Sequence, residues 1–145
     1  MAESRELSRR ECELLLRAGV AGRVAVATPT GPHILPVNYI VVEDSIVFRT
    51  SPYSLLGTYA RDSLLAFEID GFEPDRSRGW SVQVRGRAEQ VGREEIERLR
   101  RTREPDPWAG GSRSLYLRLR WTEVSGRQVG PTWDALRDTP VAHAS

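Results

Sequence analysis

The chain has 145 residues, of which 39% are hydrophobic and 28% are charged, which is ordinary for one soluble globular domain. The net charge of +1 gives no bulk attraction to nucleic acid, and no apolar run is long enough for a signal peptide or a membrane span. We therefore expect a cytoplasmic protein with no nucleic-acid or membrane partner. All 21 basic residues are arginine, which excludes lysine chemistry and leaves Arg to hold any anionic ligand.

The first predicted element is a helix that runs from Ser8 to about residue 18. Ser8 and Glu11 have the spacing of a capping box, and Gly19 ends the helix. Cys12, the one cysteine, lies on this helix between two glutamates, which disfavour a thiolate. We expect a structural role for it.

Six β-rich segments follow, with few and short helices between them. This order predicts a mainly β fold, a six-stranded antiparallel barrel with two or three short helices. We expect one domain over residues 1–128 and a C-terminal tail over 129–145. The predicted strands are 22–28, 33–42, 45–50, 63–70, 79–91 and 114–124, and the further helices are 52–61 and 92–103.

The strand 45–50 ends on a cation and two hydroxyls, at a point where a helix that starts at Pro52 is predicted. Arg49 supplies forked donors, Thr50, Ser51 and Ser54 supply hydroxyls, and a helix start adds backbone N–H groups. These groups together predict a phosphate clamp. The competing interpretation is a strand end with solvated polar residues.

Two segments, L-P-V-N-Y at 35–39 and R-T-S-P-Y-S-L-L at 49–56, resemble the flavin-binding split-barrel family. This family includes pyridoxamine 5′-phosphate oxidase-like proteins and nitroimidazole-type reductases. Further matches at 22–25, 79–86 and 107–111 extend the resemblance over roughly residues 8–128. The chain departs from the family pattern at Tyr53, where relatives often have Gly, and at Leu55, where they often have Lys.

The resemblance implies a split barrel that forms a homodimer, with flavin sites between the subunits. The burial that the tryptophans need favours a dimer contact on the strands that carry Trp80 and Trp121. FMN is the implied cofactor, with its phosphate at the clamp and its ring beside the strand that follows Leu35. Asn38, in an otherwise apolar run, needs a hydrogen-bond partner. The implied cofactor-binding residues are Arg49, Thr50, Ser51, Ser54, Val37, Asn38, Tyr39, Trp80 and Trp108.

Three functions follow from the resemblance. The first is an FMN-dependent oxidoreductase that acts on a small molecule and needs no catalytic side chain, because the flavin carries the chemistry. The second is a reductase that uses a deazaflavin coenzyme. The third is a non-catalytic binding or sensor protein that has lost tight FMN binding, which Tyr53 and Leu55 favour.

Other chemistry-bearing residues form no recognisable site. His33 and His143 have no Cys, His or carboxylate at ligand spacing, so we expect no metal. A basic surface on two strands would suit nucleic acid, but nearby glutamates favour a solvated outer face. The arginines concerned are Arg85, Arg87, Arg118 and Arg120.

Overall fold

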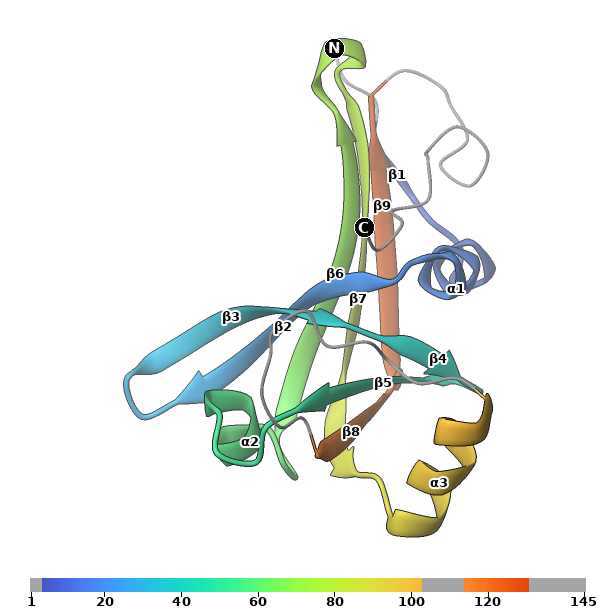
Figure 1. Ribbon diagram of the computed structural model, residues 1–145. Helices are drawn as coiled ribbons and strands as arrows, with labels where there is room; N and C mark the ends of the chain where they lie inside the picture. Colours follow the sequence, from blue (N-terminus) through green and yellow to red (C-terminus); the bar gives the residue numbers. More distant parts are fainter. Residues whose placement is uncertain (1–3, 103–113, 131–145) are drawn as a thin grey trace.

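The computed structural model describes residues 4–102 and 114–130, and it confirms a mainly β antiparallel split barrel (Figure 1). Within the described residues the α-helices are α1 (Arg9–Ala18), α2 (Leu55–Tyr59) and α3 (Arg93–Thr102), with a 3-10 turn at Pro74–Arg76. The strands are β1 (Ser4–Glu6), β2 (Ala21–Thr28), β3 (Gly31–Asn38), β4 (Ile40–Val42), β5 (Ser45–Thr50), β6 (Leu64–Glu73), β7 (Arg78–Gln90), β8 (Leu115–Arg120) and β9 (Glu123–Val129).

The strands follow the order β3-β2-β6-β7-β8-β5-β4, and every pairing is antiparallel. The long strand β7 pairs with β9 along its first part and with β8 along its last part, so it is shared between two halves of the barrel. Strands β6, β7 and β9 continue as an arm that points away from α2 (Figure 1). Strands β3 and β5 contact each other without pairing, which leaves a seam between the two halves.

The strand count differs from the predicted six because two predicted strands are broken and one short strand is added. The segment 33–42 breaks at Tyr39, whose backbone N–H donates to Val20 O at 3.0 Å. The segment 114–124 breaks after Arg120, where Trp121 N–H donates to Asp44 O at 3.2 Å. The added strand β1 pairs with β9 and is exposed, so it carries no apolar alternation.

Helix α1 begins and ends where the sequence predicted. Ser8 Oγ accepts from Glu11 N–H at 3.1 Å, and the Glu11 carboxylate accepts from Ser8 N–H at 3.0 Å, which confirms the capping box. Cys12 is fully buried, and burial raises the pKa of its thiol. A Cβ on Gly126 of β9 would lie 2.7 Å from Cys12 Sγ, so the glycine allows α1 to pack directly on the sheet.

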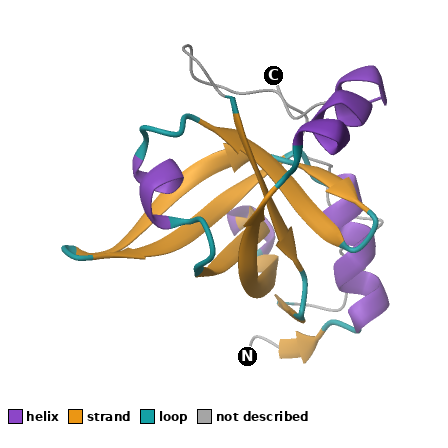
Figure 2. Ribbon diagram, turned by 90° about the horizontal axis from the view of Figure 1, so that it is seen from below, coloured by secondary structure: helices purple, strands orange, loops and turns teal. Residues whose placement is uncertain are grey.

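The core fills the inside of the barrel, and the longer helices lie beside its strands (Figure 2). Helix α3 packs separately, through Leu99, on a smaller cluster around Tyr116, and its Glu95 forms an ion pair with Arg118 of β8. The largest fully buried side chains include Tyr116, Phe48, Phe67, Leu16, Ile46, Leu117 and Leu119.

Candidate functional site

The turn after β5 is built by its own hydroxyl groups. Thr50 Oγ1 lies 2.8 Å from Ser54 Oγ, and Ser54 Oγ donates to Ser51 O at 2.7 Å while it accepts from Gly57 N–H at 3.0 Å. A hydroxyl has one hydrogen, and that of Ser54 goes to Ser51 O, so the hydrogen of Thr50 points to Ser54. Both side chains therefore hold the turn, and neither has a hydrogen left to donate to a phosphate.

Ser51 retains a hydrogen to donate, and Arg49 lies against an aromatic ring. Ser51 Oγ accepts from Tyr53 N–H at 3.2 Å, which leaves its own hydrogen available for a ligand. The guanidinium carbon of Arg49 lies 5.1 Å from the centroid of the Tyr116 ring, within the range of a cation–π contact. Tyr116 is the cross-strand partner of Arg49 and is fully buried, so the ring fixes where the charge lies.

Helix α2 starts later than the sequence predicted. It begins at Leu55 after an N-cap at Ser54, so the expected start at Pro52 was wrong, and its length is five residues. The N–H groups of Gly57 and Thr58 already bond to Ser54. A helix this short, with these donors in use, adds little to anion binding.

Gly57 lets the turn fold back on α2. A Cβ at this position would lie 2.2 Å from Ser51 O and 2.8 Å from Pro52 Cα, both of which are backbone atoms. No larger residue fits without a shift of the turn. Sequence reasoning missed Gly57, and its signal was a glycine inside a predicted helix, where Gly is unfavourable.

The strand that was predicted to lie beside the flavin ring contains Val37, Asn38 and Tyr39. Val37 and Asn38 are buried at the end of β3, which contacts β5 across the seam. Tyr39 is also buried, and its ring packs edge-on against Phe67 with centroids 5.0 Å apart. The Tyr39 side chain therefore faces the core, whereas Val37 and Asn38 lie at the end of β3, the strand that contacts β5.

Of the two tryptophan candidates, the structure describes only Trp80, and it does not bring Trp80 to the clamp. Trp80 is buried near the start of β7, opposite Gly71 of β6, whereas the clamp lies at the end of β5. Its indole Nε1 has no hydrogen-bond partner among the described residues. Trp108 lies outside the described residues.

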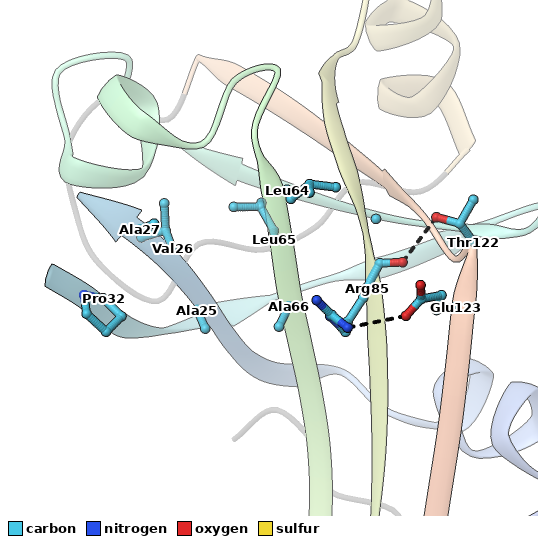
Figure 3. A pocket seen from close by; sticks show the side chains of 11 residues that line it. Ala25, Val26, Ala27, Pro32, Leu64, Leu65, Ala66, Arg85, Thr122 and Glu123 are labelled. Atoms are coloured by element: carbon cyan, nitrogen blue, oxygen red, sulfur yellow. Dashed lines mark hydrogen bonds and ion pairs between the residues drawn. The ribbon is translucent and has the colours of Figure 1, made fainter. Parts of the chain in front are cut away.

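The outer face of β2, β6 and β7 carries a shallow pocket of about 310 Å³ (Figure 3). Ala25 and Ala66 are paired across β2 and β6 at its floor, and Ile34 and Leu64 flank it with 70% and 67% of their surface exposed. At the far side, Arg85 forms an ion pair of 3.4 Å with Glu123. The lining residues are Ala25, Val26, Ala27, Pro32, Leu64, Leu65, Ala66, Arg85, Gly86, Thr122 and Glu123.

The strand arginines lie beside acceptors. Arg120 is 3.6 Å from Glu89, Arg87 donates to Asp62 O, and Arg118 pairs with Glu95 with only 12% of its side chain exposed. Arg118 is thus not on the solvated outer face that the sequence suggested. In the described part of the chain, no helix is long and apolar enough to cross a membrane, and no three His, Cys, Asp or Glu side chains are grouped to hold a metal.

Comparison with known proteins gives the family. The pyridoxamine 5'-phosphate oxidase family matches residues 8–128, so the chain belongs to this family, as the sequence resemblance indicated.

The chain is 35% identical over 130 residues to Rv0080 of Mycobacterium tuberculosis. This alignment covers 86% of this chain and 84% of that protein. It is 28% identical to the FAD binding protein from Mycobacterium smegmatis, with a TM-score of 0.70 over 85% of this chain and 96% of the other. A FAD-binding protein from Mesorhizobium loti shares the fold at 24% identity, with a TM-score of 0.70 over 86% of this chain and 97% of that one.

Proposed function

We propose that the protein binds a flavin coenzyme at the end of β5 and is a flavin-dependent oxidoreductase that acts on a small molecule. The observation that carries the proposal is Arg49, held over the Tyr116 ring two positions before Ser51, whose hydroxyl accepts from Tyr53 N–H and keeps its own hydrogen to donate. The family match over 8–128 and the similarity to the FAD binding protein from M. smegmatis support a flavin as the ligand.

The residues of the clamp fit a flavin phosphate. A guanidinium and a hydroxyl both donate to phosphate oxygens, and charge-assisted bonds of this kind are the stronger ones. The segment 49–59 contains no Asp or Glu that would repel the anion. Val37 and Asn38, on the strand across the seam, would border the ring.

When bound, the flavin supplies hydride or electron transfer, and the chain supplies binding and orientation. Arg49 would hold the phosphate at a fixed place because Tyr116 limits the positions of its guanidinium. The buried side chains of β3 would keep water from one edge of the ring.

We further propose a homodimer, formed through the outer face that surrounds the pocket. The sequence suggested a dimer contact because tryptophan side chains need to be buried. Trp80 and Trp121 are already buried within the chain, so they give no reason for such a contact. Two of the exposed apolar side chains, Ile34 and Leu64, instead lie around a floor of small alanines on which another surface can pack closely. Light scattering of the parent and of Leu64→Glu tests this, with a dimer and a monomer expected respectively. A monomeric parent would contradict it.

The coenzyme itself is tested by the absorption spectrum of the purified protein and by mass spectrometry of the compound released on denaturation. Calorimetric titration with FMN, FAD and a deazaflavin coenzyme then separates the flavin from the deazaflavin alternative. A bound flavin that turns over with an electron donor supports the oxidoreductase. Binding without turnover with any donor leaves the binding-protein alternative, and no binding of any of the three overturns the proposal.

A further inference from the structure

Tyr53 is the most exposed large apolar side chain among the described residues, with 94% of its surface accessible. Single exposed aromatics are common on proteins and need no ligand. The position of this one is specific, because it lies in the clamp turn itself, between Ser51 and Ser54. Its exposed ring therefore belongs to the same turn as the residues that would hold the phosphate.

The backbone beneath the ring is fixed from several directions. Tyr53 N–H donates to Ser51 Oγ at 3.2 Å, and Ser54 N–H donates to Ser51 O at 3.1 Å. Pro52 restricts its own φ angle, and Gly57 allows the turn to pack against α2. Only the two side-chain torsions of Tyr53 remain to adjust, so ring placement against a ligand costs little conformational entropy.

We propose that Tyr53 stacks on the adenine of FAD, so that the protein prefers this dinucleotide to FMN. The inference rests on the proposed flavin site. FMN ends at its phosphate, which Arg49 and Ser51 would bind, whereas FAD continues through a second phosphate to adenosine. The adenosine must then leave the clamp over its border, and an aromatic face offers the stacking surface that a base requires.

Distance along the chain agrees with this arrangement. One residue, Pro52, separates Tyr53 from Ser51, so their Cα atoms are at most about 7 Å apart. The ring therefore lies within the reach of a group attached to a phosphate bound at Ser51. Stacking would also remove an exposed apolar surface from water, which favours the complex.

Calorimetric titration of FAD and of FMN into four proteins tests the proposal. They are the parent, Tyr53→Phe, which keeps the ring, Tyr53→Ser, which removes it, and Phe72→Ser, which removes an exposed aromatic ring in the β6–β7 arm. We expect the parent to bind FAD about 10-fold more tightly than FMN, the size of one stacked base. Tyr53→Ser should lose about 10-fold for FAD with FMN unchanged, and the other two variants should resemble the parent.

ADP provides a second measurement, because it carries the adenosine and the two phosphates without the flavin. We expect ADP to compete with FAD in the parent and to compete about 10-fold less well in Tyr53→Ser. Binding of both flavins with no change of their affinity ratio in Tyr53→Ser would overturn the role of Tyr53 and leave the proposed function intact. If Tyr53→Ser loses the same affinity for both flavins and its mass in light scattering changes, the stacking role of Tyr53 is overturned in favour of a subunit contact. Binding of neither flavin by the parent would overturn the proposed function as well.

Discussion

The hydroxyl of Tyr39, at the break between β3 and β4, donates to the carbonyl oxygen of Leu16 in the last turn of α1 at 2.7 Å. Both residues are buried, and they are separated by 22 residues along the chain. The bond therefore ties α1 to the end of the strand that carries Val37 and Asn38. Helix α1 positions the seam through this contact although it contributes no residue to the proposed clamp.

Tyr39→Phe should lower the free energy of unfolding by about 1–2 kcal/mol, because it leaves the Leu16 carbonyl oxygen without this donor in a buried place. The phenyl ring keeps its contact with Phe67, so packing changes little. Urea denaturation measures the effect. Tyr53→Phe removes an exposed hydroxyl and serves as the control. Equal stability of all three proteins would contradict the importance of the bond.

Arg49→Ala should weaken flavin binding more than Thr50→Val does. Arg49 would make a charge-assisted contact with the phosphate, whereas the hydrogen of Thr50 already goes to Ser54. The difference should be on the order of 1–2 kcal/mol, measured by calorimetric titration with FMN. Ser51→Ala should fall between the two. If Arg49→Ala binds FMN as the parent does, Arg49 is not part of the clamp.

Gly57→Ala should destabilise the protein by roughly 1–3 kcal/mol and weaken flavin binding, because the new Cβ would displace the backbone of Ser51 and Pro52. Gly92→Ala is a matched control, since a Cβ there meets no atom within 4 Å. Thermal unfolding and FMN titration of both variants provide the measurements. A neutral Gly57→Ala would mean that the turn yields easily and is not preorganised.

Leu55→Lys should increase flavin affinity about fivefold, by a screened attraction of roughly 1 kcal/mol between the ammonium and the phosphate. Leu55 is partly buried against the core, and the lysine stem can keep that contact while its amine reaches water. Leu14→Lys, on the exposed side of α1, controls for the added charge. An unchanged affinity at both positions would mean that position 55 does not face the phosphate.

Low pH should remove the stabilisation that the Glu11 carboxylate gives to the N-terminal cap of α1. The hydrogen bond from Arg5 lowers the pKa of Glu11 from 4.5 to about 2, and the bond from Ser8 N–H adds to this. A carboxyl whose folded pKa is depressed stabilises the fold above about pH 4.5, and this contribution is lost as the pH falls toward 2. Glu11→Gln should therefore be less stable than the parent at pH 7 and nearly equal to it at pH 2. Urea midpoints at several pH values decide this, with Glu94→Gln as a surface control.

The sequence predicts the parts of this protein whose cause is local. The capping box at Ser8 and the apolar alternation of β7 depend on residues close in the chain, and both are found. The break at Tyr39 depends on Leu16 and Val20, which a strand pattern does not reveal.

The same limit applies to the candidate site. The sequence finds the hydroxyls after β5, but the use of the Thr50 hydrogen depends on the three-dimensional turn. The burial of Trp80 depends likewise on strand register, which its residue type does not specify.

Because Cys12 is packed against Gly126, its thiol can report the separation of α1 from β9. Cys12 is the single thiol of the sequence, and it is fully buried where α1 meets β9. A thiol reagent therefore reacts only after the helix separates from the strand, and the reaction rate reports how often that happens. Since α1 also carries the Leu16 carbonyl that Tyr39 binds, labelling with and without flavin would measure how strongly the ligand restrains the far side of the barrel.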